Sequence, residues 1–315
     1  MQTKLTFLIG CTSCGKGGVG RELALRTGGE IVSLDSMKVY RRMDIGTAKP
    51  SADVRRRIPH HLIDVAEPSE EFSAAEFLRH AERAIAEIES RGRPVFVVGG
   101  TPLYAKALVD GLFEGPGRDL TIRARLQQDA AVSGRAVLHD RLRGVDPLAA
   151  TRIHPNDERR LVRALEVFEL TGRPISDLQQ QWDRPPSRYS SVFLGLRRGR
   201  EDQNHRINER VRRMMVAGLV DEVRSLLAES PPLGTAARRA LGYAEIIQHL
   251  EGGLELADAV EIIKIKTRRF AKAQRTWFKR FLDTEWIDLA PDEAAGDVVA
   301  RLMEDRGTLW SPSPK

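Results

Sequence analysis

Residues 7–17 constrain the fold more than any other stretch of this chain. An apolar run over residues 5–9 is typical of a buried strand, and it leads into a glycine, four further residues, a Gly-Lys pair and the beginning of a helix. This is the layout of a phosphate-binding loop, in which backbone N–H groups turn towards an anion and the helix start adds positive potential. The predicted phosphate site consists of Gly10, Cys11, Thr12, Ser13, Cys14, Gly15, Lys16 and Gly17.

The loop departs from the usual pattern at its last position. The pattern ends in Ser or Thr, whose hydroxyl ligates Mg²⁺, whereas this chain has Gly17. A glycine-rich turn that binds no ligand is therefore the alternative interpretation. The two cysteines of the chain, Cys11 and Cys14, also lie in the loop. Because no second Cys or His pair is nearby, we expect them to be small loop residues rather than a zinc or redox pair.

Composition narrows the class of protein but not its partner. The 315 residues suffice for one large α/β domain or two smaller ones. A formal net charge of +6 permits a nucleic-acid partner without requiring one. The cysteine count gives no disulfide framework, no signal peptide precedes the first strand, and no apolar run approaches membrane-spanning length. We expect a cytoplasmic protein with no membrane partner.

Two further polar side chains follow predicted strands. Asp35 comes directly after the apolar residues 30–34, and Thr101 follows residues 94–100. The carboxyl ends of parallel strands line one crevice, so Asp35 and Thr101 are expected beside the loop, with Asp35 as a candidate catalytic base. An Asx-type turn is the alternative role for this aspartate. The alternation of strands and helices predicts an α/β fold: a P-loop-type parallel sheet flanked by helices.

Residues 115–185 differ from the rest of the chain, because they carry helical periods, many arginines and no convincing buried strand. We predict an all-helical insertion there, within a catalytic core formed by residues 1–114 and 186–315. The arginines outnumber the acids in this stretch, which favours an anionic partner. Ion pairing of these arginines with neighbouring acids is the alternative.

Periodicity predicts the remaining elements of the core. A helix beginning at His205 would place Arg206 and Arg210 on one face, within reach of a diphosphate. Residues 37–50 have no clean period and are expected to form a loop whose cations either contact phosphates or face solvent. The tail beyond Arg306 is expected to fray. Strands are also predicted at 60–65 and 189–196, and helices at 73–90, 219–228, 235–250 and 256–281, the last of them basic with interleaved aromatics.

Taken together, these motifs resemble the bacterial tRNA dimethylallyltransferases, also called tRNA isopentenyltransferases, of the IPP transferase family. The resemblance covers essentially the whole chain, and its most specific segments are Asp44-Ile45-Gly46-Thr47-Ala48-Lys49-Pro50 and His154-Pro155-Asn156-Asp157. Further matching segments are residues 10–16, 35–37, 59–64, 98–104, 163–167, 241–243 and 267–278.

The resemblance implies transfer of a dimethylallyl group from dimethylallyl diphosphate to the exocyclic amine of the adenine just 3′ of the tRNA anticodon, with release of diphosphate. It implies that Asp35 is the base, that Thr101 lies beside the flipped adenine, and that Lys16 and Arg210 neutralise the leaving diphosphate. The helical insertion would contact the anticodon stem-loop, and the protein would act as a monomer. The implied tRNA-binding residues are Asp35, Ser36, Met37, Lys38, Thr101, Arg123, Arg159, Arg160, Leu161, Val162 and Arg163.

Several positions depart from this family pattern. Gly17 replaces the Ser or Thr, Cys11 and Cys14 replace the usual Pro and Ser, and Lys38 stands where Gln is frequent. Mg²⁺ is expected as a cofactor held through water and the diphosphate itself, with its protein ligand unknown. The alternative functions are a tRNA-binding homologue with weakened catalysis, a P-loop small-molecule kinase and an adenylate isopentenyltransferase.

Overall fold

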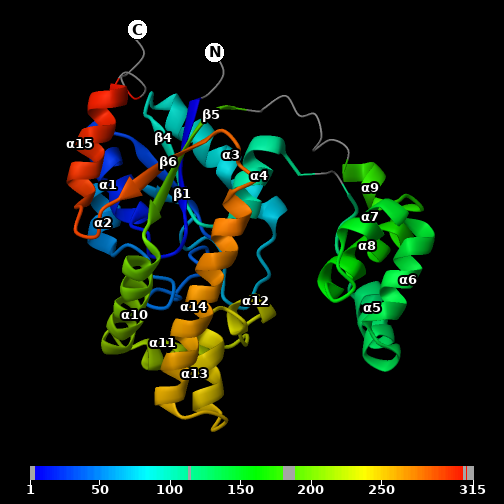
Figure 1. Ribbon diagram of the computed structural model, residues 1–315. Coiled ribbons are helices and arrows are strands. Elements are labelled where there is room, and N and C mark those ends of the chain that lie inside the picture. Colours follow the sequence, from blue (N-terminus) through cyan, green and yellow to red (C-terminus); the bar gives the residue numbers. More distant parts are fainter. Residues whose placement is uncertain (1–3, 113–114, 180–188, 308–309, 311–315) are drawn as a thin grey trace. The chain divides into compact units, whose positions relative to one another are not determined.

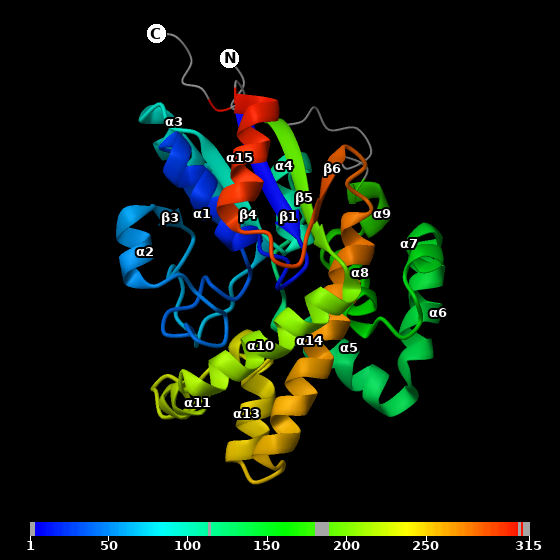
Figure 2. The same ribbon diagram turned by 60° about the vertical axis from the view of Figure 1, so that its left-hand side comes forward.

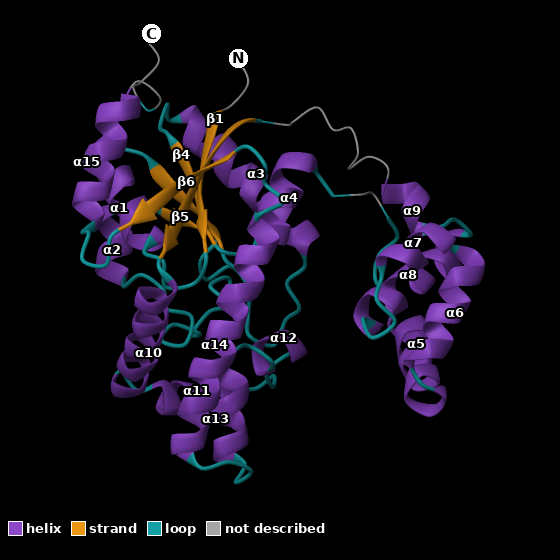
Figure 3. Ribbon diagram, in the orientation of Figure 1, coloured by secondary structure: helices purple, strands orange, loops and turns teal. Residues whose placement is uncertain are grey.

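The core of the protein is a six-stranded parallel sheet with helices on both faces, as the computed structural model shows for residues 4–112, 115–179, 189–307 and 310 (Figures 1 and 3). The strand order is β3-β2-β4-β1-β5-β6. This confirms the predicted α/β class, because every paired strand runs parallel to its neighbours. The strands are β1 (Lys4–Gly10), β2 (Glu30–Leu34), β3 (His60–His61), β4 (Val95–Gly99), β5 (Ser190–Arg198) and β6 (Thr284–Leu289).

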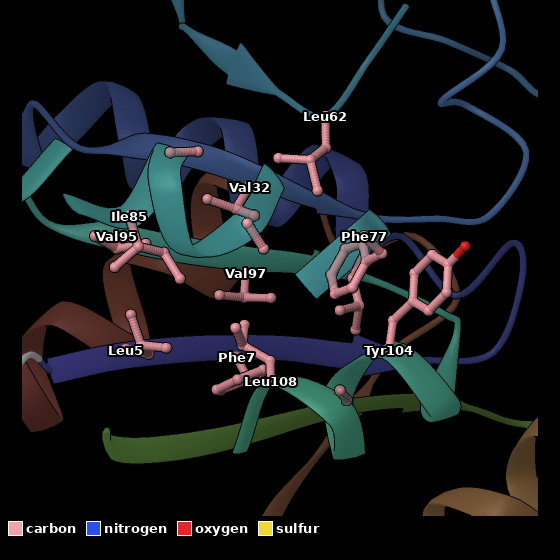
Figure 4. Close-up of a cluster of buried hydrophobic side chains, with 14 of the residues drawn as sticks. Leu5, Phe7, Val32, Leu62, Phe77, Ile85, Val95, Val97, Tyr104 and Leu108 are labelled. Atoms are coloured by element: carbon pink, nitrogen blue, oxygen red, sulfur yellow. The ribbon is translucent and has the colours of Figure 1, made fainter. Parts of the chain in front are cut away.

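Apolar side chains bury both faces of this sheet. On one face, α3 (Ala74–Ser90) and α4 (Pro102–Asp110) pack over β1 and β4, and the rings of Phe77 and Tyr104 stack with centroids 4.0 Å apart (Figure 4). On the other face lie α1 (Lys16–Thr27) and α15 (Ala295–Arg306), which pack against each other (Figure 2). Since central parallel strands are covered on both sides, their sequences are apolar throughout rather than alternating.

A second group of helices lies beyond the edge at which the strands end (Figure 2). It surrounds its own hydrophobic core, in which the buried rings of Tyr40 and Tyr243 pack against aliphatic side chains. These helices bring basic and polar side chains to the carboxyl edge of the sheet. They are α10 (Arg200–Val216), α11 (Leu219–Leu227), α12 (Thr235–Arg238), α13 (Tyr243–Leu250) and α14 (Leu256–Phe278). The short α2 (Ala52–Arg57) precedes β3 in the chain.

Residues 110–186 form a separate compact unit, and residues 1–109 with 187–315 form the other. The smaller unit has its own core of leucine, valine and alanine side chains. In the described part of the chain it contains helices only: α5 (Leu120–Ser133), α6 (Arg135–Val145), α7 (Pro147–Arg152), α8 (Glu158–Thr171) and α9 (Ile175–Leu178). No helix in the described ranges combines the length and the apolar character that a membrane crossing needs.

Some predicted elements were wrong. The strand expected over 60–65 is only two residues long, because Leu62 and Asp64 adopt positive φ angles of 62° and 58°. The helix expected over 235–250 is interrupted before Tyr243 by Gly242, whose φ is +95°. The helix expected from His205 already begins at Arg200, where acidic residues in its first turn favour the start.

The end of the chain also differs from its prediction. β6 and α15 follow the last predicted helix, and β6 extends the sheet beside β5. Trp310 lies beyond the expected fraying point but is only 4% exposed, and its indole N–H donates to Thr6 Oγ1 over 3.0 Å. The remaining residues expected to fray, 308–309 and 311–315, lie outside the described residues.

The helical unit is held by a buried carboxylate, Glu166, which is fully enclosed. It accepts two hydrogen bonds from the Arg123 guanidinium at 2.7 and 2.8 Å and one from Arg163 at 2.7 Å. It also accepts the backbone N–H of Asp119, the residue that caps α5. Burial alone would raise the pKa of Glu166, but these hydrogen bonds lower it to about 2.

We expect Glu166→Ala to lower the unfolding free energy of the helical unit by about 3–5 kcal/mol, because it leaves two partly buried arginines without their buried anion. Glu169→Ala is the control, since its more exposed pair with Arg125 contributes at most about 1 kcal/mol. Hydrogen exchange of the α5–α8 amides in the full chain measures both. The stabilisation by Glu166 should be complete above its unfolded pKa of about 4.3 and be lost as the pH falls towards 2. Equal protection in the two variants would contradict this role.

Candidate active site

The phosphate-binding loop follows β1 and leads into α1, as its sequence predicted. Gly15 caps α1 at a φ of +104°, a conformation that residues with a Cβ rarely adopt. At Gly10 a Cβ would stand 2.5 Å from the Leu196 carbonyl oxygen of the neighbouring strand, so the close approach of β1 and β5 requires a glycine. Lys16 folds back over the loop and donates to the Cys11 carbonyl over 2.9 Å.

The two loop cysteines are free thiols buried in the loop's packing. Burial raises the pKa of the Cys11 thiol, which keeps it protonated and unreactive near neutral pH. The two cysteines are therefore placed as small packing residues of the loop, as expected from the sequence.

Side chains from distant parts of the chain fix the shape of the loop. Gln274 of α14 accepts the Thr12 N–H over 2.8 Å and donates to the Gly100 carbonyl over 2.6 Å, which ties the loop to the end of β4. Gln203 of α10 donates to the Thr12 carbonyl over 3.0 Å and accepts a hydrogen bond from Arg275. Sequence reasoning did not identify these glutamines, because only the fold brings them to the loop.

Arg198, at the end of β5, makes a further connection to the loop. Its guanidinium donates to the Cys14 carbonyl over 3.0 Å and pairs with Asp202 at 3.2 Å. It also donates to backbone carbonyls that follow β6. The loop is therefore held on both sides before any ligand binds.

Asp35 and Thr101 lie at neighbouring strand ends, as predicted. Oδ1 of Asp35 accepts the backbone N–H of Met37 over 2.9 Å, so the Asx-type turn considered as an alternative is present. Its other oxygen, Oδ2, accepts no hydrogen bond from the described residues and is available to a substrate. The Thr101 hydroxyl accepts the Ser36 N–H over 3.2 Å, which joins the turn after β2 to the end of β4.

Two cations lie near Asp35. Arg210 of α10 donates to the Thr12 hydroxyl and to the Thr47 carbonyl, both over 3.3 Å. Burial lowers the pKa of Arg210, and the Asp35 carboxylate opposes that shift. Burial likewise lowers the pKa of Lys38 to about 8, with the same carboxylate opposing and nearby cations reinforcing it. The loop, the carboxylate and these cations form a site suited to an anionic leaving group next to a base.

The predicted tRNA-binding residues fall into two groups. Ser36, Met37 and Lys38 form the turn after β2 and are partly exposed. In the helical unit Arg159 and Arg160 are exposed, and the latter pairs with Asp157 at 3.2 Å.

The other four predicted residues of the helical unit have structural contacts. The side chains of Leu161 and Val162 are buried in its hydrophobic core, and Arg123 and Arg163 bind the enclosed Glu166. This placement differs from the expected surface contact, because apolar packing and the buried anion occupy these side chains. Other arginines of the unit pair with acids, as the ion-pair alternative predicted: Arg125 with Glu169, Arg135 with Glu158, Arg141 with Asp129, and Arg143 with Asp140.

Three of the four cations in residues 37–50, namely Arg41, Arg42 and Lys49, pair with carboxylates. Lys49 is almost fully buried and pairs with Asp44 and Asp64, each at 2.6 Å. Glu222 of α11 accepts the backbone N–H groups of residues 44–46 and the hydroxyl of Tyr243. Residues 44–47 therefore form a turn that is fixed by hydrogen bonds to Glu222.

The side chains near the end of the loop do not fit a protein-held Mg²⁺. Gly17 provides no hydroxyl, and the Arg21 Nη1 atom lies 3.4 Å from where a Cβ of residue 17 would stand. Mg²⁺ prefers oxygen ligands, whereas the groups gathered here are mostly cationic. Across residues 4–112, 115–179 and 189–307, no three His, Cys, Asp or Glu side chains are grouped as a metal site.

Comparisons with known proteins agree with this geometry. A family model described as IPP transferase matches residues 38–281. A tRNA dimethylallyltransferase of Geobacter metallireducens is 50% identical over 287 residues, which cover 91% of this chain and 93% of the relative.

Solved structures are similar over nearly the whole chain. The tRNA isopentenylpyrophosphate transferase of Bacillus halodurans is 38% identical with a TM-score of 0.72, covering 98% of this chain and 97% of that one. A eukaryotic dimethylallyltransferase acting on tRNA is 27% identical with a TM-score of 0.78, covering 97% of this chain and 77% of its own.

Proposed function

Because the chain belongs to the IPP transferase family, we propose that the site at the carboxyl edge of its sheet prenylates the adenine just 3′ of the tRNA anticodon. Relatives that are 50% and 47% identical to this chain are tRNA dimethylallyltransferases. The observation that carries the assignment of residues is the convergence of the phosphate loop, the open Oδ2 of Asp35 and the Arg210 guanidinium at one edge of the sheet.

The reaction joins the adenine N6 to the first carbon of the dimethylallyl group as that carbon's bond to diphosphate oxygen breaks. An aromatic amine is a weak nucleophile, so the Asp35 carboxylate assists by taking an N6 proton through Oδ2. Thr101 lies beside this carboxylate and orients the extruded base. The backbone N–H groups of the loop, with Lys16 and Arg210, neutralise the charge that develops on the departing diphosphate.

The exposed arginines of the helical unit serve tRNA binding in this proposal. Arg159 and Arg160 offer their guanidiniums to backbone phosphates of the anticodon stem-loop, whereas Arg123 and Arg163 hold α5 and α8 in place through Glu166. The turn from Ser36 to Lys38 contacts the nucleotide that carries the target adenine. Enzymes of the family generally depend on Mg²⁺. No step described above needs a metal that is held by side chains of this chain.

The proposal is tested with dimethylallyl diphosphate labelled in its carbon chain and two acceptors, an unmodified tRNA and adenosine monophosphate. Label is expected in the tRNA only. A tRNA with guanine at the position 3′ of the anticodon is the matched control and should remain unlabelled. Label in adenosine monophosphate, or none in the tRNA despite intact tRNA binding, would contradict the proposal.

Gln274 offers a test of how the site is positioned. We expect Gln274→Ala to lower kcat by about 10²-fold, because the loop and Gly100 lose their common partner and the diphosphate shifts relative to Asp35. Steady-state kinetics with tRNA in excess measures this change. Gln248→Ala, at an exposed position on α13, should leave the kinetics unchanged. An unaltered kcat in the Gln274 variant would show that the link does not position the loop.

A further inference from the structure

A small cavity opens beside Gly17. Its volume is about 30 Å³, enough for one or two oxygens of a phosphate. Arg21 of α1, Lys38 of the turn after β2 and His60 of β3 are among the residues that line it. No functional role was assigned above to Arg21 or to His60.

The cavity is positively charged and lacks a counter-ion from the protein. Among the described residues, neither the Arg21 guanidinium nor the Lys38 ammonium pairs with a carboxylate at salt-bridge distance, although Asp35 is near Lys38. Burial and the neighbouring cations lower the pKa of His60 to about 4, so this ring is neutral near pH 7. Two unpaired and partly buried cations favour an anion, because an uncompensated charge away from water is costly.

Helix geometry explains why Arg21 reaches the loop. Residues 17 and 21 are one turn apart on α1, and helical side chains lean towards the N-terminus of their helix. The guanidinium of Arg21 therefore covers Gly17, with Nη1 3.4 Å from the position of the missing Cβ. A guanidinium therefore lies against the position from which a Ser or Thr side chain at residue 17 would project.

We propose that Arg21 and Lys38 form a subsite for the terminal phosphate of the donor's diphosphate, and that their charge replaces the charge of a loop-held Mg²⁺. This inference rests on the proposed function, since it assigns a role to the same diphosphate. It explains two features together: the glycine at position 17 and the guanidinium beside it. A diphosphate then binds this chain without a divalent ion.

The test is calorimetric binding of inorganic pyrophosphate to the full chain, in Mg²⁺ and in EDTA. Wild-type protein is expected to bind with affinities within about threefold of each other in the two buffers, since its own cations serve the phosphate. Arg21→Met should weaken binding in EDTA by about 10–100-fold, the loss of a charge-assisted contact. Arg57→Met, at an exposed position on α2, is the matched control and should bind like wild type.

A second variant reverses the proposed exchange. Gly17→Thr combined with Arg21→Met restores the hydroxyl and removes the guanidinium, so it should bind pyrophosphate only when Mg²⁺ is present. Loss of wild-type binding in EDTA, or unchanged binding in Arg21→Met, would overturn the inference while leaving the transferase function intact. No pyrophosphate binding by wild type in either buffer would overturn both.

Discussion

Asp35→Asn is expected to lower the rate of prenyl transfer to tRNA by about 10²–10⁴-fold, the usual contribution of a positioned general base. The substitution is nearly isosteric, and its amide oxygen can still accept the Met37 N–H that Oδ1 accepts now. The turn after β2 should therefore keep its shape, and the loss falls on proton removal by Oδ2. Single-turnover kinetics with saturating tRNA and donor measures that step directly.

The control for this variant is Asp53→Asn on α2. That aspartate is exposed and pairs with its neighbour Arg56, so its substitution should leave the rate unchanged. Binding of tRNA to Asp35→Asn should remain close to that of wild type. A rate in Asp35→Asn within about threefold of wild type would show that the carboxylate is only a turn residue and that another group accepts the proton.

Lys16→Met should lower kcat/KM for dimethylallyl diphosphate by about 10²–10³-fold, because charge on the departing diphosphate grows as its bond to carbon breaks. The ammonium donates a hydrogen bond to the Cys11 carbonyl of its own loop over 2.9 Å, so the substitution removes the charge without breaking an ion pair. Methionine preserves much of the aliphatic length over the loop. The donor concentration is varied at saturating tRNA to obtain the constant.

Lys272→Met provides the comparison for this second prediction, since Lys272 is exposed on α14. It removes one positive charge from the protein without touching the loop. Equal effects of the two substitutions would indicate that net charge, rather than contact with the diphosphate, governs the reaction.

The sequence predicted the site best where the chemistry depends on short segments. A glycine-rich loop after an apolar strand, and polar residues directly after two further strands, converge because parallel strands end at one edge. Asp35 and Thr101 were found in this way. Gln274 could not be, because 262 residues separate it from Thr12 and one glutamine in a basic helix carries no local signal.

In the helical unit, the number of arginines did not predict which of them are free to bind an anionic partner. Its many arginines indicated an anionic partner, yet Arg123 and Arg163 enclose Glu166, and others pair with acids of neighbouring helices. A sequence shows how many charges are present but not which pairs form, since pairing depends on which helix faces meet. The break at Gly242 was missed because helical periodicity does not show the positive φ of a single glycine, and β6 was missed because its pairing with β5 is a tertiary contact.

The most direct test of the account is nucleoside mass spectrometry of tRNA after reaction with dimethylallyl diphosphate, for wild type and Asp35→Asn side by side. The account predicts a dimethylallyl adduct on the adenosine just 3′ of the anticodon with wild type, and an adduct reduced at least about 10²-fold with the variant. An adduct of equal yield from both proteins, or none from wild-type protein that still binds tRNA, would contradict it.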